Sequence, residues 1–357
     1  MHSTQNDLSK QIQDTVLQAI NTNKTFTIKA GGSKDFYGRN VTADKLLSLA
    51  EHQGIISYEP TELVIKARSG TPLKILQQVL AENRQMLAFE PPAYHEKTTL
   101  GGTLAGNFSG PRRAYSGAAR DYVLGTTVLN GKAEILSFGG EVIKNVAGYD
   151  ISRLMTGALG TLGVILEASL KVVPMPEAEI TLMQQTSIDA ALLKLHQWSQ
   201  LPLPISASCF YQDKLYIRLS GTEKAIDNAQ QSIGGEILKQ AHNFWQSITE
   251  QTHPFFHSTQ ALWRISLASN TPALPLEGDY LYEWGGALRW LKSDLDLQSI
   301  RSEPNLSGGH ATLFRSLGER NDIFHPLPTP LLKLHQRLKL AFDPHGLFNI
   351  GRMYADF

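Results

Sequence analysis

The spacing of apolar residues predicts an amphipathic helix at the start of the chain. Leu8, Ile12, Val16 and Ile20 recur every four residues, which places them on one helical face, and Asp7 is suited to cap the helix. Short apolar and β-branched runs bounded by turn residues then predict strands. These runs are FTIKA at 26–30, GIISYEP at 54–60 and LVIKARSG at 63–70.

Two further helices are predicted among these strands, at 43–52 and 72–83. For the second, Thr71 is suited to cap the helix and Pro72 suits its first position. Beyond residue 98 the chain is rich in glycine, and three apolar runs again predict strands. They are VLGTTVLN at 123–130, ILSFGG at 135–140 and LGVILEASLKVV at 162–173.

The character of the chain changes after Pro174 and Pro176, where glycine becomes rarer. Helix-like segments such as 187–200 then alternate with strand-like segments such as 214–221. A last helix, PLLKLHQRLKLAF, precedes DPHGLFNIGRM. We expect a domain at 1–175, a second at 176–335, and a tail at 336–357 that returns to the first.

The composition narrows the classes of function. The chain has 357 residues, 33 basic and 33 acidic, so no net charge exists to attract nucleic acid or an anionic membrane. Its one cysteine, Cys209, excludes an intrachain disulfide and a cysteine-ligated iron–sulfur cluster, and we expect it to be a buried apolar residue. No leader or membrane-spanning stretch is recognisable. We expect a cytoplasmic protein with no direct membrane insertion, whose attachment to the inner membrane would require a partner.

Three glycine-rich loops are candidates for cofactor binding. KAGGSKDF at 29–36 follows a strand, so its backbone N–H groups could converge on a phosphate, with charge added by Lys29 or Lys34; a plain hairpin turn is the alternative. TTLGGTLAGNFSG at 98–110 is either a packed helical turn around a polar cofactor or a solvent loop. In GALGTLGVI at 157–165 the glycines precede a strand, which excludes the nicotinamide-binding fingerprint there.

The order of these loops resembles the FAD-binding domain of the vanillyl-alcohol oxidase-type (PCMH-type) flavoproteins. Within that superfamily, PPAYHEKTTLGGTLAGNFSGPRRAYSGAARD, KNVAGYDISRLMTGALGTLGVI and the closing FDPHGLFNIGRM resemble the FAD-binding subunits of glycolate oxidase. The motifs cover about the first half of the chain and its last twenty residues. The resemblance implies an α+β fold, in which two α+β subdomains hold FAD and a smaller α+β cap domain follows.

The resemblance also implies positions for the cofactor. The first loop would hold the pyrophosphate, the second the diphosphate and the flavin, and the third the adenine and ribose, with Asp121 after the next turn. The implied residues are Gly31, Gly32, Ser33, Lys34, Thr98, Gly101, Gly102, Thr103, Asn107, Ser109, Gly110, Asp121, Gly160, Gly163, Val164 and Ile165. Some members attach flavin to a histidine in the first loop. Residues 24–40 contain neither His nor Cys, so we expect non-covalent FAD.

Catalytic side chains are harder to identify. A 2-hydroxy-acid dehydrogenase needs a cation for the carboxylate and a base for the hydroxyl proton. The catalytic relatives carry a motif resembling H-x-G-D-G-N-x-H, which this chain lacks; its nearest feature supplies His310 and Arg315. Other candidates are His95 near the flavin and the cations Arg112 and Arg113, for which a solvated surface pair is the alternative. His253 and His257 have a helical metal-binding spacing but no third ligand, so we expect no metal.

These features favour a subunit over a complete enzyme. In the family that the chain resembles, glycolate is oxidised to glyoxylate by an assembly of this type of chain, a related FAD-binding catalytic chain and an iron–sulfur chain. The alternatives are a self-sufficient FAD-dependent dehydrogenase for glycolate or D-lactate, and a scaffold that has lost its flavin. The intact glycine loops argue against the scaffold.

Overall fold

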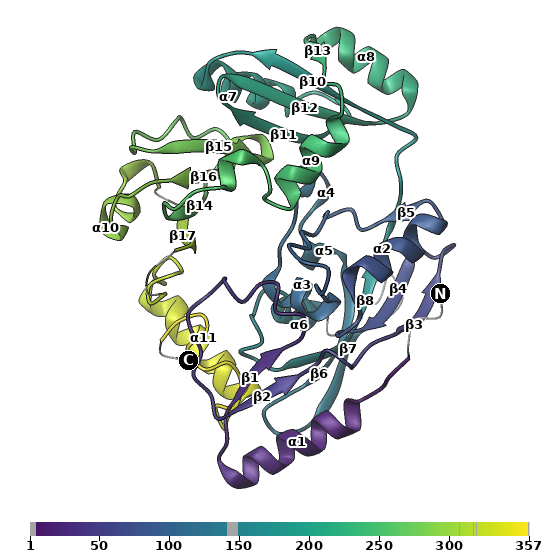
Figure 1. Ribbon diagram of the computed structural model, residues 1–357, viewed down its shortest axis with the longest axis vertical. Helices are drawn as coiled ribbons and strands as arrows, with labels where there is room; N and C mark the ends of the chain where they lie inside the picture. The colour runs from purple at the N-terminus through teal and green to yellow at the C-terminus, as the bar shows by residue number, and fades with distance from the viewer. Residues whose placement is uncertain (1–4, 141–148, 307, 317, 319, 356) are drawn as a thin grey trace.

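The computed structural model describes residues 5–140, 149–306, 308–316, 318, 320–355 and 357, and contains two large antiparallel sheets (Figure 1). The first sheet has five strands in the order β3-β4-β8-β6-β7. All are strands expected from the sequence. Their bounds are β3 (Ile55–Glu59), β4 (Val64–Arg68), β6 (Val123–Leu129), β7 (Ile135–Gly139) and β8 (Val164–Lys171).

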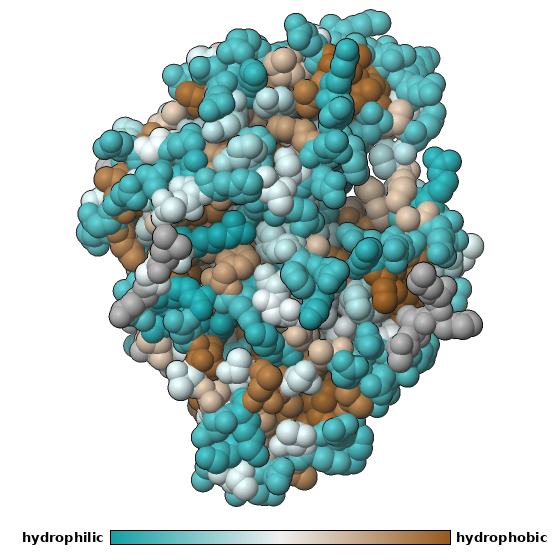
Figure 2. Space-filling view, viewed as in Figure 1, coloured by the Kyte–Doolittle hydropathy of each residue, from teal (hydrophilic) through white to brown (hydrophobic). Residues whose placement is uncertain are grey.

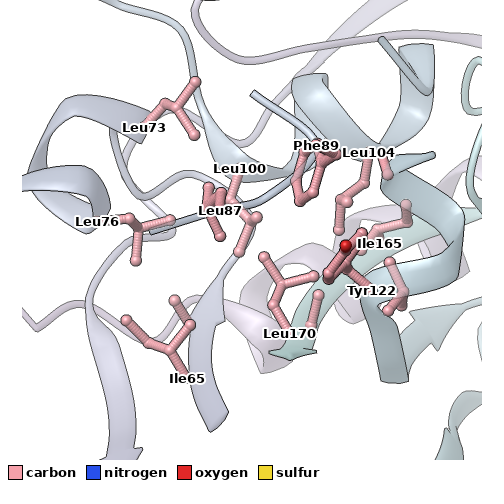
Figure 3. Close-up of a cluster of buried hydrophobic side chains, with 14 of the residues drawn as sticks. Ile65, Leu73, Leu76, Leu87, Phe89, Leu100, Leu104, Tyr122, Ile165 and Leu170 are labelled. Carbon is pink, nitrogen blue, oxygen red and sulfur yellow. The ribbon is translucent and has the colours of Figure 1, made fainter. Parts of the chain in front are cut away.

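The central strand β8 is buried on both faces of this sheet, which explains its almost continuous run of apolar residues. Ile165 and Leu170 pack on one face with helices α2 (Leu73–Glu82) and α3 (Leu100–Gly106), as Figure 3 shows. Val164 and Leu166 pack on the other face with helix α1 (Ser9–Thr22) and with the C-terminal tail. The predicted helix is present, but its N-cap residue is Leu8, which makes no side-chain cap, so the expected cap at Asp7 is wrong. The Asp7 carboxylate lies one residue earlier and accepts from the Ser9 N–H at 2.9 Å.

The second sheet has eight antiparallel strands in the order β13-β10-β12-β11-β15-β16-β14-β17. Helices α7 (Ile188–Trp198) and α8 (Glu223–Ile233) cover one face. The other face meets aromatic residues of the N-terminal half, including Tyr37 and Phe108. The strands are β10 (Ala178–Gln185), β11 (Ile205–Tyr211), β12 (Lys214–Gly221), β13 (Glu236–Ile237), β14 (Leu262–Ser266), β15 (Asp279–Glu283), β16 (Leu288–Lys292) and β17 (His310–Arg315).

Shorter elements complete the fold. Two small sheets pair β1 (Phe26–Lys29) with β2 (Lys45–Ser48) and β5 (Gln85–Met86) with β9 (Val173–Pro174). The remaining helices are α4 (Arg113–Ser116), α5 (Ala119–Tyr122), α6 (Tyr149–Met155), α9 (Ala241–Thr249), α10 (Leu297–Arg301) and α11 (Thr329–Phe342), with single 3-10 turns at Pro254–Phe256, Trp284–Gly286 and Pro304–Leu306.

The helix predicted at 43–52 is wrong. Residues 45–48 form strand β2, which pairs in parallel with β1. Asp44 anchors the pairing, because its carboxylate accepts from the Thr25 N–H at 2.9 Å. Tertiary pairing thus overrides the helical preference of the segment. Thr71 also does not cap α2; its hydroxyl instead bonds the backbone of Gly54.

The C-terminal segment lies against the N-terminal half. Helix α11 lies beside β1 and β2 in Figure 1, and Phe348 forms a parallel bridge with Phe26. The outer face of α11 is exposed and carries Leu334 and Leu340, at 51% and 65% exposure. Figure 2 shows apolar surface over this helix and the β1–β2 pair. Among the described residues, no helix combines the length and apolar composition needed to cross a bilayer.

Candidate functional site

A cleft of about 300 Å³ runs between the β1–β2 pair, α3 and the start of β8. This volume lies in the range of small-molecule sites. Ten of the sixteen residues that the resemblance assigned to FAD line the cleft: Gly31, Gly32, Ser33, Lys34, Gly101, Gly102, Gly160, Gly163, Val164 and Ile165. The three glycine-rich loops, far apart in sequence, therefore converge on one space. The motif at 144–150 lies largely outside the described residues.

The first loop presents unused hydrogen-bond donors to the cleft. The N–H groups of residues 31–34 donate to no atom of the described chain. Gly32 has φ +71°, a conformation that favours glycine. A Cβ on Gly31 would lie 1.6 Å from the Lys97 carbonyl oxygen, so no larger residue fits there. Consecutive free amides in such a loop suit the oxygens of a pyrophosphate.

Three cations surround these amides. The first is Lys34, whose pKa is lowered to about 8 by burial against the opposing effect of Glu250. The others are Arg320, which donates to the Asp35 carbonyl at 2.6 Å, and Arg352, which donates to the Tyr37 carbonyl at 2.5 Å. None of the three forms a salt bridge with a carboxylate of the described chain. A pyrophosphate in the cleft would supply the missing negative charge.

The sequence analysis did not assign Arg320, Arg352 or Asn349 to the cofactor. Asn349 lines the cleft, accepts from the Ile28 N–H at 2.9 Å and donates to the Leu159 carbonyl at 2.7 Å. Asn349 and Arg352 belong to the closing FDPHGLFNIGRM motif, so the resemblance of that motif could have indicated both residues as part of the cleft. Nothing around Arg320 in the sequence indicated its position.

Helix α3 forms the second wall of the cleft. Thr99 caps it by accepting from the Gly102 N–H at 3.3 Å, and Gly101 is pressed against Ser69. A Cβ on Gly102 would meet only Thr99 Oγ1, at 3.4 Å, because this glycine faces the open cleft. Thr98 and Thr103 are buried and bond backbone carbonyls, so they hold the loop and do not line the cleft.

The third loop and the remaining assigned residues have distinct surroundings. The N–H groups of Gly160 and Gly163 also donate to no atom of the described chain. Asn107 ends α3 in a left-handed conformation, φ +51°, and accepts from the Arg120 N–H. The Asp121 carboxylate pairs with Arg153 at 2.5 Å. Neither Asn107 nor Asp121 lines the cleft.

Ser109 and Gly110 line a second, smaller cavity of about 20 Å³ between the glycine-rich loop and the eight-stranded sheet. Arg264, Glu283 and Gln251 also line it, and none of these three was singled out from the sequence. Phe108, which neighbours Gly106 of the main cleft, forms part of its wall. The Phe108 ring therefore lies between Gly106 and the small cavity.

His310 and Arg315, the predicted catalytic pair, both lie on β17. Neither lines the main cleft. The pKa of His310 is lowered by desolvation and by the charges of Arg264, His325 and Arg113. The Arg315 guanidinium lies 4.8 Å from the ring centroid of Phe36 and 5.7 Å from that of Tyr94. Arg315 thus packs on the rings of Phe36 and Tyr94.

The other candidates from the sequence have structural surroundings. Arg112 is not a solvated cation: it bonds Glu90 at 3.1 Å and Glu179 at 2.9 Å. His95 is exposed, and its ring accepts from the Lys97 N–H. His253 begins a 3-10 turn rather than a helix, and no metal-binding group of three or more ligands exists among the described residues. Cys209 is buried as expected, which raises the pKa of its thiol.

Glu283 gives the small cavity a testable pH dependence. Burial raises its pKa from 4.5 to about 7, although Trp290 and Arg264 oppose the shift. The protonated form is thus favoured in the folded state, so stability is lost as pH rises from about 4.5 through 7. Over this pH range Glu283 should lower the free energy of unfolding of the wild-type protein by roughly 3 kcal/mol. The Glu283→Gln variant should not show this decrease. Denaturant titrations of both proteins at pH 5 and pH 8 measure it; parallel pH profiles would contradict a buried carboxyl.

The comparisons with known proteins agree with this geometry. Residues 8–139 match the family model described as FAD binding domain. The D-lactate dehydrogenase of Anaerostipes hadrus is 34% identical over 47% of this chain, but this match spans only 35% of that enzyme. Among solved structures, an alkyldihydroxyacetonephosphate synthase superposes with a TM-score of 0.64 over 94% of this chain and 74% of that one. At 14% identity, that likeness shows the fold alone.

One relative matches from end to end. The glycolate oxidase subunit GlcE of Escherichia coli (strain K12) is 47% identical over 350 residues, which cover 98% of each chain. The α+β, PCMH-type fold expected from the glycine loops is thereby confirmed. With its loops converging on one cleft, the chain belongs to the GlcE-type subunits of glycolate oxidase, a family of FAD-binding flavoproteins.

Proposed function

We propose that this protein is the FAD-binding subunit of a glycolate oxidase complex that converts glycolate to glyoxylate and passes electrons to partner subunits. The observation that carries the proposal is the end-to-end similarity to GlcE. When bound, FAD would accept the reducing equivalents. The chain's own part is to bind and orient the dinucleotide, with the amides of residues 31–34 and the cations Lys34, Arg320 and Arg352 at its pyrophosphate.

Two features of the chain support a multi-subunit assembly with a related FAD-binding catalytic chain and an iron–sulfur chain. Its one cysteine cannot ligate an iron–sulfur cluster, so electrons that leave the flavin need another carrier. The exposed leucines of α11 supply apolar surface that a partner would cover. Through such partners the complex would associate with the inner membrane from the cytoplasm. The division at 1–175, 176–335 and 336–357 stays a prediction, supported by the separate sheets on either side of residue 175.

The complex tests this function directly. The isolated chain should contain FAD and oxidise glycolate only slowly, whereas the chain combined with its partner subunits should turn glycolate over with a dye acceptor. A complex that contains FAD in this chain and yet leaves glycolate unchanged would overturn the proposal.

A self-sufficient 2-hydroxy-acid dehydrogenase that uses His310 and Arg315 is the second candidate, supported by the partial similarity to D-lactate dehydrogenase. It predicts rapid bleaching of the isolated chain's flavin by glycolate or D-lactate. A flavin-less scaffold predicts a purified chain that holds no FAD even after reconstitution, contrary to the free amides of the cleft.

We also propose that the FAD is bound without a covalent bond. Among the described residues that line the main cleft, none is His, Cys or Tyr, the side chains that would attach a flavin. Acid precipitation should therefore release all flavin into the supernatant, where its absorbance is measured. Yellow colour that stays in the washed pellet would contradict this prediction.

A further inference from the structure

Two arginines that form no salt bridge with a described carboxylate stack on one indole where the N-terminal half meets the eight-stranded sheet. The guanidinium of Arg113, on α4, lies 4.3 Å from the ring centroid of Trp284, and that of Arg264, on β14, lies 5.2 Å from it. Neither forms a salt bridge with a described residue; Arg264 hydrogen-bonds the Tyr37 hydroxyl. The arginines are also close enough for each to lower the pKa of His310.

The neighbouring arginine shows how this chain treats a structural cation. Arg112 is bonded to both Glu90 and Glu179, and Arg218 reaches the same Glu90 at 2.8 Å. Two adjacent positions in the sequence thus differ: Arg112 is paired directly with two carboxylates, whereas Arg113 forms no salt bridge with a described residue and has only the longer-range charge of Asp121. Partly buried positive groups without a partner are unfavourable unless a ligand supplies the negative charge. The Arg113–Arg264 pair therefore points to an anion.

The small cavity beside Arg264 specifies the rest of the ligand. Glu283 and Gln251 line it, at 4% and 7% exposure. Glu283 Oε2 accepts from the Trp290 indole N–H at 2.7 Å, whereas Gln251 Oε1 is buried and accepts no hydrogen bond from the part of the chain that the structure describes. A buried amide oxygen left unpaired is costly and calls for a donor. The cavity therefore offers hydrogen-bonding groups next to an anion site.

The size of the cavity limits the ligand. Its 20 Å³ hold about one water molecule, and its other walls include Phe108, Trp290 and Phe314. A hydroxyl group can take the place of that water, while a long or branched chain meets aromatic rings. Arg264 belongs to both the cavity and the cation pair, so a carboxylate at the arginines would stand next to a hydroxyl in the cavity.

We propose that this chain has its own site for a small 2-hydroxy acid, in which Arg113 and Arg264 bind the carboxylate and Glu283 and Gln251 hydrogen-bond the hydroxyl. The site deepens the proposed function and rests on it, because it places a glycolate-sized anion on this subunit as well as FAD. Burial raises the pKa of Glu283 to about 7, so below that pH the bound carboxylate does not face a second full negative charge. Because the small cavity holds only about one water molecule, glycolate should bind more tightly than larger 2-hydroxy acids.

Calorimetric titration of the FAD-loaded chain with glycolate, and with acetate as the analogue without a hydroxyl, tests the site. We expect Arg113→Met and Arg264→Met each to weaken the binding of both anions by about tenfold to a hundredfold. Gln251→Met should weaken glycolate and leave acetate unchanged. Arg337→Met, on the exposed face of α11, is the matched control and should alter neither.

Each result separates the site from the proposed function. FAD absorbance of every variant reports folding. If an arginine-to-methionine variant fails to fold, Arg113→Lys or Arg264→Lys, which keeps the charge but loses the planar fork, takes its place. Unchanged glycolate affinity in the Arg113 and Arg264 variants, or no glycolate binding by the FAD-loaded wild-type chain, overturns the site. If the complete complex still oxidises glycolate in that case, the proposed function stands without it.

Discussion

Replacing Lys339 by methionine is expected to lower the free energy of unfolding by about 3–5 kcal/mol. Lys339 Nζ lies 2.6 Å from Asp343 Oδ2, and the side chains of the pair are 9% and 0% exposed. The same ammonium group donates to the carbonyls of Thr161 and Phe348. Without it the buried Asp343 carboxylate keeps only its bonds from the N–H groups of Leu347 and Phe348. The tail also loses its bond to Thr161 of the third loop and holds that loop through Asn349 and the neighbouring packing. Denaturant titration measures the loss.

The control is an ion pair of the same type in solvent. Lys10 and Asp14 are also four residues apart on a helix, with 2.7 Å between their charged atoms, but their side chains are 79% and 56% exposed. We expect Lys10→Met to change stability by less than about 0.5 kcal/mol. Equal effects of the two substitutions would show that the Lys339 pair is not buried in solution.

The second large effect is expected on the affinity for FAD rather than on the stability of the fold. In Gly102→Val the added side chain enters the main cleft, because nothing but Thr99 Oγ1 lies near its Cβ. The chain without FAD should unfold at the same temperature, since valine in α3 also removes the entropic penalty of a helical glycine. FAD affinity should fall by about tenfold to a hundredfold, the effect of a steric clash of 1–3 kcal/mol. Fluorescence titration of the apoprotein with FAD measures it.

A second glycine provides the control. Gly221 ends β12, and a Cβ there would meet only Pro204, at an ordinary 3.6 Å. Gly221→Val should bind FAD like the wild type. If Gly102→Val also binds FAD with full affinity, the cofactor does not lie against α3 at this position.

The sequence predicted best where local pattern and tertiary role agree. Apolar residues four positions apart, starting at Leu8, identified α1, and the apolar run at 162–173 identified β8. Both predictions held because each element buries a continuous apolar face. It failed at 43–52, where a strongly helical composition is outweighed by parallel pairing with β1. No local signal reports such pairing, because the partner strand lies about twenty residues earlier.

The cofactor site could be predicted in part for a related reason. Glycines mark backbone that can approach a ligand closely, so the sequence could single out the loops at 31–34, 101–102 and 160–163, which line the main cleft. Side chains that reach the cleft from far away were missed, among them Arg320. Of the residues that line the small cavity, the sequence analysis named only Ser109 and Gly110. Arg264 and Glu283 were missed because they lie in ordinary strands and acquire their character only from the burial and charges around them.

A crystal structure of the chain with bound FAD tests the central claim most directly. We expect the pyrophosphate oxygens within hydrogen-bonding distance of the N–H groups of residues 32–34, with Lys34 and Arg352 beside them. A dinucleotide whose phosphates lie away from this loop, with those amides still facing solvent, would contradict the account.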